Sequence, residues 1–266
     1  MSKFKAFGGV GHGGRDSGAV GNGLRESDIN LVQALAWEKE MKRHGVEVKL
    51  SRYKDENDDI NEEVRECNAF NPDIAVDFHT NSGGGDGCEF IHSIFGTDSK
   101  NLANCINEEV VKLGQNSRGL KTKKGNNGRD YFAFIRGTVC PAVISECAFI
   151  DNSNDISIVD TKAEQEAYGI AVAKGCLKYL GIPYIENTDN KVYKIVTGGF
   201  GSKENAEAKA AQLKGLTGWY LEVKEVEGHP GDFCIHTGGF TGISKVEKKM
   251  NALKELTNWW MIYTLE

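Results

Sequence analysis

The stretch PDIAVDFH, residues 72–79, is mostly apolar and ends in a histidine. Its length and its apolar run are typical of a buried β-strand whose end reaches polar surroundings. The stretch PAVISECAF, residues 141–149, has the same character and carries Glu146. Buried strands separated by helical segments are typical of a parallel sheet. These two stretches therefore predict a domain of the α/β class.

Outward from these strands, short apolar runs alternate with amphipathic segments. The other predicted elements are strands at residues 4–7, 46–50 and 88–92 and helices at residues 27–44, 60–67, 102–110 and 164–180. Ser27 is the expected N-cap of the first helix. Residues 114–130, rich in Gly, Asn and Lys, are predicted to be a loop. Residues 1–180 are therefore expected to form a mostly parallel twisted sheet with helices on both faces.

Residues 191–266 follow GIPYIENTDN at 181–190, which has the composition of a linker. The tetrad TGGF occurs at 197–200 and again at 237–240. Each copy reads as strand, Gly-rich turn, helix and strand, and EGHPGD at 227–232 would join the copies as a hairpin. The repeat therefore predicts a small α+β domain of β-α-β-β-α-β type.

Charge and composition exclude several classes of protein. The net charge is −6, divided as −7 over residues 1–190 and +1 over 191–266, so no nucleic-acid partner is expected. No apolar run has the length of a membrane span or of a signal peptide, so no membrane partner is expected either. Seven cysteines without a C-x-x-C pair favour reduced thiols and synthesis in the cytoplasm. No oligomeric state is predicted.

The stretch GGVGHGGRDSGAVGNGLRE, residues 8–26, contains the spelling G-x-G-x-x-G. A dinucleotide site requires a helix to begin within that fingerprint, because the N-terminus of the helix holds the pyrophosphate. Here helical periodicity begins only near Ser27, and no G-K-[ST] follows that would indicate a P-loop. The stretch is instead predicted to be a long flexible turn that carries His12 and reaches Glu26.

Four side chains are candidates for a catalytic centre: His12, Glu26, His79 and Glu146. Each lies near the end of a predicted strand or in the loop that follows one, and the carboxyl ends of parallel strands share one edge of a sheet. Two imidazoles and one carboxylate suit a zinc ion and leave one coordination position open for water. A carboxylate such as Glu146 in an apolar strand requires a partner or a function. Together the four residues favour a catalytic metal site.

Each candidate also has a simpler interpretation. His12 would be a loop histidine without a partner, Glu26 an acid favoured at a helix N-terminus, and His79 a hydrogen-bonding residue at a strand end. Glu146 would pair with a cation such as Arg136. The remaining histidines are assigned to packing or to the surface: His44, His92, His229 and His236.

Four blocks of this sequence resemble, in order, the motifs of the zinc-dependent N-acetylmuramoyl-L-alanine amidases of the type 3 family. GHGGRDSGAVG resembles the family's GHGG-x-D-x-G-A opening, and LRES resembles the following segment with its glutamate. DFHTNS resembles the S-x-H-x-N block, and PAVISECAFIDN resembles the final P-A-V-L-x-E-x-G-F-x-x-N block. The resemblance covers roughly residues 4–180. It departs at Val10 and Gly11, where the family usually has Asp, and at Ala148, where it usually has Gly.

The resemblance implies that His12, Glu26 and His79 hold zinc and that Glu146 is the catalytic acid/base. The implied reaction is hydrolysis, by zinc-activated water, of the amide between N-acetylmuramic acid and L-alanine in peptidoglycan. Asn81, two residues beyond His79, is a candidate for orienting the substrate.

A polymeric substrate requires an open groove. Gly83–Gly85 and residues 114–130 are expected to form its walls.

The C-terminal repeat resembles the sporulation-related repeat (SPOR) domain, in the stretch VYKIVTGGFGSKENAEAKAAQLK. This resemblance implies that residues 191–266 bind the glycan strands of the bacterial cell wall. The order of the domains, without a signal peptide, resembles a phage endolysin or a sporulation autolysin that acts on the wall after release. The aromatic residues that would stack on sugars, unless they lie in the core, are Trp219, Tyr220, Trp259 and Trp260.

Two other functions remain open at this point. The chain would be a non-catalytic cell-wall-binding protein, although the four intact candidate residues argue against this. Alternatively, it would be a zinc peptidase that cuts the peptide stem, which the spacing of the motifs does not exclude. A thiol nucleophile at Cys140 or Cys147 has no histidine nearby in the sequence to activate it.

Overall fold

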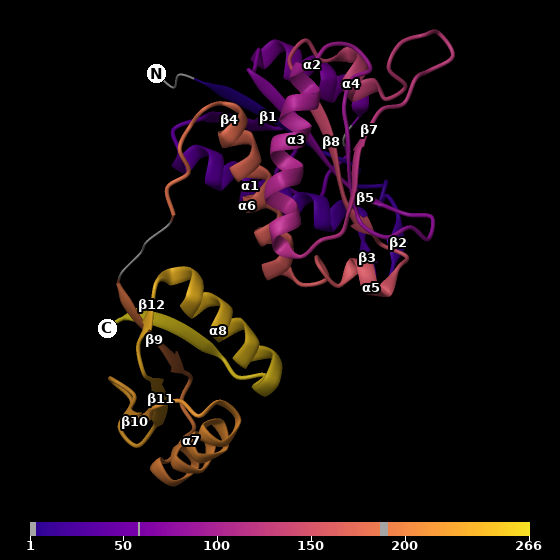
Figure 1. Cartoon of the computed structure of the whole chain (residues 1–266). Helices are drawn as coiled ribbons and strands as arrows, with labels where there is room; N and C mark the ends of the chain where they lie inside the picture. Colours follow the sequence, from indigo (N-terminus) through magenta and orange to yellow (C-terminus); the bar gives the residue numbers. More distant parts are fainter. Residues whose placement is uncertain (1–3, 58, 187–190) are drawn as a thin grey trace. The chain divides into compact units, whose positions relative to one another are not determined.

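The computed structural model describes residues 4–57, 59–186 and 191–266, in two compact units, Met1–Ile185 and Glu186–Glu266 (Figure 1). Residues 187–190 of the predicted linker lie outside the described residues. Among the helices of the described ranges, none combines the length and apolar character needed to cross a membrane.

A six-stranded sheet in the order β4-β1-β5-β8-β6-β7 organises the first unit. Its strands are β1 (Lys5–Val10), β4 (Glu47–Leu50), β5 (Ile74–Asn81), β6 (Cys88–Ile91), β7 (Ser117–Lys121) and β8 (Ala142–Phe149). Strands β4, β1, β5 and β8 are parallel, whereas β6 runs antiparallel to β8 and parallel to β7. The predicted mostly parallel sheet is confirmed, and the two stretches that predicted it form its central pair.

Strand β7 lies within residues 114–130, which were predicted to be only a loop. It pairs with β6 at the edge of the sheet, with Leu120 opposite Phe90. Its residues are intermediate or exposed and none is buried. The prediction was wrong because an edge strand with polar side chains has the composition of a loop.

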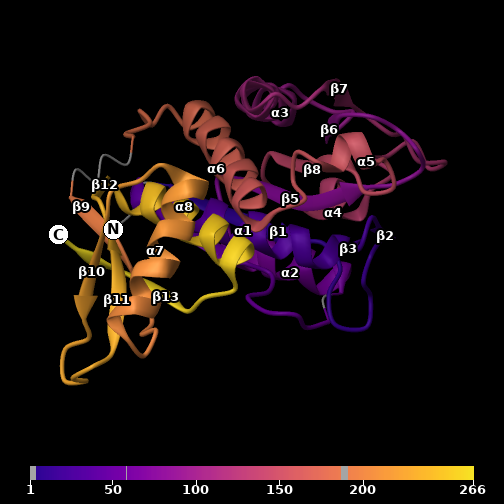
Figure 2. The same ribbon diagram turned by 90° about the horizontal axis from the view of Figure 1, so that it is seen from below.

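Helices cover both faces of the sheet. The helices α1 (Glu26–Arg43), α3 (Asp98–Val110) and α6 (Lys162–Tyr179) pack on one face, and α2 (Ile60–Phe70) and α4 (Ala133–Gly137) pack on the other. The first core includes Trp37, Val76 and Tyr168, and the second includes Phe7 and Ile144. Figure 2 shows α3 and α6 on one side of β5 and β8 and α2 on the other. Two short helices, η1 (Val111–Leu113) and α5 (Ser153–Ile156), complete the unit.

Helix α1 begins one residue earlier than predicted, and Ser27 is not its N-cap. The N-cap is Arg25, whose side chain makes no capping hydrogen bond. The first N–H groups donate to loop carbonyls instead, Glu26 to Ala19 at 2.9 Å and Ser27 to Ser17 at 3.1 Å. The folded loop therefore replaces a side-chain cap and places the Glu26 carboxylate at the start of the helix.

The second unit is a five-stranded antiparallel sheet with two helices. Its elements are β9 (Val192–Thr197), α7 (Lys203–Thr217), β10 (Leu221–Glu225), β11 (Phe233–Thr237), β12 (Phe240–Thr241), α8 (Ile243–Thr257) and β13 (Met261–Leu265). The two copies of the repeat meet where Val196 of β9 lies opposite His236 of β11. Their threonines make matching bonds, because Thr197 Oγ1 accepts from the Ile235 amide (2.9 Å) and Thr237 Oγ1 from the Ile195 amide (3.0 Å).

Aromatic rings also cross between the two copies. Phe200 of the first TGGF turn packs edge-on against Trp259 (5.0 Å between ring centroids), and Phe240 of the second packs against Trp219 (4.9 Å). Trp219 and Trp259 line the core of this unit, whereas Tyr220 and Trp260 remain 72% and 66% exposed. One aromatic residue of each neighbouring pair therefore faces the core, as predicted, although both pairs lie just before β10 and β13 and not within them.

Candidate active site

His12 lies two residues beyond the end of β1 and is held in a tight loop. Its φ of 64° lies in the left-handed region, and Gly13 and Asp16 exchange two backbone hydrogen bonds just after it. The Asp16 carboxylate contacts the Nδ1 atom of His12 at 2.8 Å, which leaves the Nε2 atom directed elsewhere. The loop histidine therefore has a defined orientation and a partner, contrary to its simpler interpretation.

The stretch predicted to be a flexible turn contains a hairpin that leads to Glu26. Strands β2 (Val20–Gly21) and β3 (Leu24–Arg25) are joined by Asn22 and Gly23, both at positive φ as a type I′ turn requires. The Asn22 side chain donates to the carbonyl of Ile150, just beyond β8, at 2.7 Å. The hairpin is therefore anchored to the edge of the sheet where the strands end.

Glu26 is buried and held by backbone amides from two segments. The Ala19 amide donates to Oε2 at 2.8 Å, and the Thr80 amide of β5 donates to Oε1 at 3.0 Å. Glu26 is therefore more than an acid placed at a helix N-terminus, because its carboxylate connects the hairpin loop to the central strand.

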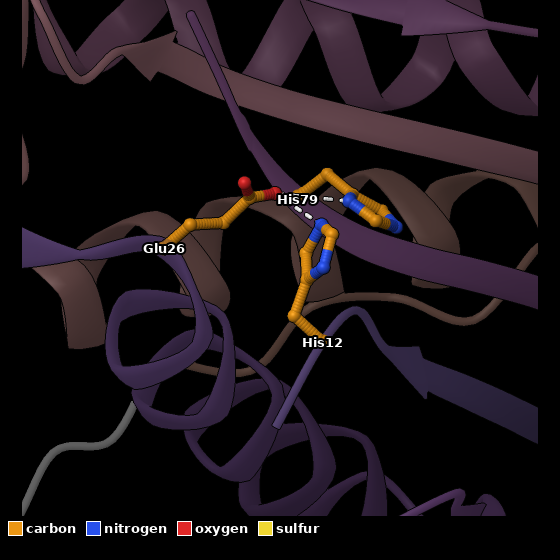
Figure 3. Close-up of side chains that lie close together, drawn as sticks. All are labelled: His12, Glu26 and His79. Carbon is orange, nitrogen blue, oxygen red and sulfur yellow. Dashed lines mark hydrogen bonds and ion pairs between the residues drawn. The ribbon is translucent and has the colours of Figure 1, made fainter. Parts of the chain in front are cut away.

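The structure brings His12, Glu26 and His79 together (Figure 3). Glu26 Oε1 lies 3.3 Å from His12 Nε2 and 3.0 Å from His79 Nδ1. One ligand atom from each residue lies within 4.8 Å of the other two. The imidazole rings meet edge-on, at 82° and with 5.2 Å between centroids, so two nitrogens and one oxygen converge on one point.

Electrostatics reflect this convergence. Burial favours the neutral form of Glu26, but hydrogen bonds with His12 and His79 outweigh it and hold the pKa of Glu26 far below its usual range. The hydrogen bond to Glu26 raises the pKa of His12. Burial opposes the charged form of His79, yet the neighbouring Asp77 and Glu26 raise its pKa well above the usual value. The cluster is therefore built to favour positive charge beside Glu26.

Glu146 lies beside this cluster on the neighbouring strand. It is paired in register with His79 of β5 on one side and with Glu89 of β6 on the other. Burial raises the pKa of Glu146 to about 7, with the nearby carboxylates contributing in the same direction. Arg136, considered as its partner, instead donates to the carbonyls of Asp130 and Tyr131. A carboxyl that titrates near neutrality can both accept and return a proton.

Asn81 lies at the end of β5, and its side chain is directed toward Glu89. Its Nδ2 donates to Glu89 Oε2 at 3.4 Å, and Glu89 in turn pairs with Arg118 of β7. The Arg118 guanidinium lies over the Phe149 ring. Glu89 and Arg118 extend the site across the sheet. Glu89 lies in a strand that was predicted, but its ion pair with Arg118 depends on β7, which was not predicted.

The Gly83–Gly85 segment follows β5 and is fixed to the end of β8. The amides of Gly83 and Gly84 both donate to Asp151 Oδ2, at 2.9 and 2.8 Å. The role of this segment as a groove wall stays a prediction, as does that of residues 114–130.

The cysteines considered as nucleophiles lie outside the candidate site. Cys147 is buried on the opposite face of β8 from Glu146, where Thr80 Oγ1 contacts its sulfur at 3.3 Å. Burial raises its pKa to about 12, so the thiol stays protonated. Cys140 precedes β8, at the end of the strand remote from the cluster.

Comparison with known proteins gives a consistent result. Residues 9–178 match the family described as N-acetylmuramoyl-L-alanine amidase. N-acetylmuramoyl-L-alanine amidase CwlM of Bacillus licheniformis is 31% identical over 215 residues, 79% of this chain and 81% of the relative. The sporulation-specific N-acetylmuramoyl-L-alanine amidase of Bacillus subtilis (strain 168) is 31% identical over 218 residues, 80% of this chain and 82% of the relative.

Among solved structures, the catalytic domain of CwlV, an N-acetylmuramoyl-L-alanine amidase from Bacillus (Paenibacillus) polymyxa var. colistinus, matches with a TM-score of 0.61 and 28% identity. The match covers 68% of this chain and 99% of that domain. The two curated relatives match a larger share of the chain than Met1–Ile185 provides, so their similarity extends into the second unit.

Proposed function

Because the chain belongs to the N-acetylmuramoyl-L-alanine amidase family, we propose that His12, Glu26 and His79 bind zinc and that Glu146 is the acid/base of the reaction. The chain is a peptidoglycan hydrolase that cleaves the amide bond between N-acetylmuramic acid and L-alanine. The observation that carries the proposal is the convergence of three ligand atoms within 4.8 Å of one another.

The donor set fits zinc. His12 Nε2, His79 Nδ1 and Glu26 Oε1 are the borderline nitrogen and oxygen ligands that zinc accepts, and three protein ligands leave a position for water. Zinc, when bound, supplies the Lewis acidity that polarises the amide carbonyl and lowers the pKa of a water molecule to about 7. Glu26 contributes the negative charge that partly neutralises a divalent cation.

Glu146 performs the proton transfers in this proposal. Its carboxylate takes a proton from the attacking water and later delivers a proton to the departing amine of L-alanine. The pKa of about 7 that burial gives Glu146 suits both transfers near neutral pH. Its register position beside His79 keeps it on the same face of the sheet as the proposed ligands.

Asn81 is proposed to orient the substrate. Its amide lies one residue beyond Thr80, whose backbone holds Glu26, and its Nδ2 contacts Glu89 at 3.4 Å. A short movement of that side chain would release a donor toward a sugar or peptide carbonyl.

The decisive experiment combines metal analysis with identification of the products. The wild-type protein is expected to contain one zinc ion and to release peptides with a free N-terminal L-alanine from purified cell walls. His79→Ala is expected to lose both zinc and activity, whereas His229→Ala, at an exposed position in the second unit, retains both. Release of fragments cut within the stem would favour a peptidase, and full zinc content in His79→Ala would refute the ligand assignment.

We further propose that the second unit is a SPOR-like domain that binds the glycan strands of peptidoglycan. Tyr220 and Trp260 support this role, because both are large, mostly exposed and placed at equivalent positions of the repeat. The Tyr220 carbonyl accepts from the Gly238 amide at 2.8 Å and the Trp260 carbonyl from the Gly198 amide at 2.9 Å. Exposed aromatic rings suit stacking against sugars.

Wall binding would raise the local concentration of the catalytic unit on its substrate. The site of action is proposed to be the bacterial cell wall, reached after synthesis in the cytoplasm and release by lysis, as for an endolysin or an autolysin. Zymography of lysed against intact producing cells tests this route.

A further inference from the structure

We propose that Asp77 is a positioning residue that orients His79 for the metal. This inference rests on the proposed zinc site. Asp77 and His79 alternate with Phe78 along β5 and so lie on the same face of the sheet. Asp77 Oδ2 lies 3.2 Å from His79 Nε2, while the other ring nitrogen, Nδ1, lies 3.0 Å from Glu26. The carboxylate therefore occupies the side of the ring that faces away from the proposed ligand cluster.

An imidazole binds a metal through one nitrogen, and the partner of the other nitrogen determines which one is free. A hydrogen bond from Nε2–H to Asp77 leaves the Nδ1 lone pair of His79 directed at the cluster. Such a carboxylate fixes the ring orientation and makes the ligand more basic. His12 shows the same arrangement with its nitrogens exchanged, because Asp16 contacts its Nδ1 while its Nε2 faces Glu26.

The two carboxylates differ in exposure, and this difference points to Asp77. The Asp16 side chain is 71% exposed, whereas that of Asp77 is only 3% exposed. Water and salt screen an interaction at the surface much more than one in the interior. Asp77 Oδ1 is also buried without a hydrogen-bond partner among the described residues, so the bond to His79 is the contact that compensates its burial.

Two glycines, Gly9 in β1 and Gly11 just after it, lie against Asp77 and His79. A Cβ atom added to Gly9 would lie 2.7 Å from Asp77 Oδ1 and 2.0 Å from Glu63 Oε1. A Cβ atom added to Gly11 would lie 2.3 Å from His79 Cε1. The absence of side chains at these two glycines leaves the space in which the carboxylate and the ring sit.

The test measures zinc affinity, by competition with a chromophoric chelator, for the full chain and three variants. Asp77→Ala is expected to bind zinc 10- to 100-fold more weakly than wild type. Asp77→Asn, which keeps an oxygen acceptor of the same shape, should lie between the two. Asp73→Asn is the control, because its carboxylate contacts the Lys5 amide at the opposite end of β5. Affinities of both Asp77 variants within twofold of wild type would overturn the inference.

Two further readouts separate positioning from a general structural role. Long-range ¹H–¹⁵N spectra of the metal-free protein, at a pH where His79 is neutral, are expected to show the proton of His79 on Nε2 in wild type and a mixture of tautomers in Asp77→Ala. The activity of Asp77→Asn should recover in excess zinc, because the missing interaction weakens binding of the metal. Activity that stays low at saturating zinc, with an unchanged His79 spectrum, would contradict the inference.

These outcomes differ from failure of the proposed function itself. If wild type binds no zinc, or if His79→Ala binds it as tightly as wild type, the proposed zinc site is refuted, and so is the role of Asp77. If wild type binds zinc through His79 while the Asp77 variants are unaffected, only the role of Asp77 is refuted.

Discussion

His79 and Glu146 occupy paired positions in the register of the neighbouring parallel strands β5 and β8. Side chains at paired positions project from the same face of a sheet, so strand pairing alone keeps a proposed metal ligand next to a proposed acid/base. The two residues are 67 positions apart in the sequence, yet neither depends on a mobile loop for its place.

Glu146→Gln is expected to retain zinc and to lose activity. The amide has nearly the shape of the carboxyl group but cannot transfer the proton. Because general acid–base catalysis contributes about 10²- to 10⁴-fold to the rate, kcat is expected to fall by about that factor. Metal content and turnover on purified walls check this, with Glu166→Gln on the exposed surface of α6 as the control. An active Glu146→Gln enzyme would rule out the assigned role.

The stability of the metal-free protein should depend on pH through Glu146. Its pKa is about 7 in the folded state and near the usual 4.5 in the unfolded state, so between these values the folded chain binds the additional proton. This contribution to stability is present at pH 4.5 and is lost as the pH rises through 7, with a limit of roughly 3 kcal/mol. The free energy of unfolding of Glu146→Gln, relative to that of wild type, should therefore be higher at pH 8 than at pH 4.5. Urea unfolding at both pH values checks this, and an equal difference at the two would contradict it.

Gly11→Ala is expected to displace the His79 ring. The new methyl group would lie 2.3 Å from His79 Cε1, and relief of such a clash costs about 1–3 kcal/mol and moves the ring away from Glu26. Thermal unfolding and zinc titration should both show a loss. Gly215→Ala is a matched control, because its Cβ atom meets nothing within 4 Å inside helix α7, where alanine stabilises by roughly 0.5–1 kcal/mol.

Zinc removal should lower both activity and stability, reversibly. A ligand that binds only the folded state at 100 times its Kd adds about 2.7 kcal/mol to the free energy of unfolding. Chelator-treated protein is therefore expected to melt at a lower temperature and to lose wall hydrolysis, and both should return with added zinc. A melting temperature that does not change when zinc is removed or added, together with hydrolysis that resists the chelator, would argue against the metal site.

Tyr220→Ala and Trp260→Ala are expected to weaken binding to purified glycan strands without changing the melting temperature of the second unit. Both rings are largely exposed, so they contribute little to the core. Trp219→Ala is the contrasting variant, because it removes a ring that packs against Phe240 and should destabilise by several kcal/mol. Undiminished co-sedimentation of Tyr220→Ala and Trp260→Ala with glycan strands would count against their role in binding.

Much of the fold could be predicted from the sequence, because apolar runs of strand length are strong signals when the strands are buried on both faces. The central strands β5 and β8 are of this kind, and they were placed within two residues. Strand β7 was missed because its stability comes from pairing with β6, a long-range contact without a local signal. Ser27 was misplaced as a cap because loop carbonyls, which carry no signature in the side chains, satisfy the first amides of α1.

The candidate site was predictable in part for a related reason. All four candidate residues lie near strand ends or in the following loop: His12, Glu26, His79 and Glu146. The parallel order of the strands brings such positions together at one edge of the sheet. The role of Asp77 could not be predicted, because it lies inside an apolar run. Periodicity there shows that Asp77 shares a face with His79, but not which atoms it contacts. The partners Glu89 and Arg118 depend on the pairing of β6 and β7 and could be found only in the folded chain.

The exchanged aromatic contacts of the second unit make its two copies depend on each other. Each TGGF phenylalanine packs against a tryptophan that belongs to the other copy of the repeat. A single copy would leave an apolar ring in water and an unfilled place beside its tryptophan. The core of this unit is therefore closed only when both copies are present, so removal of either copy is expected to unfold the other.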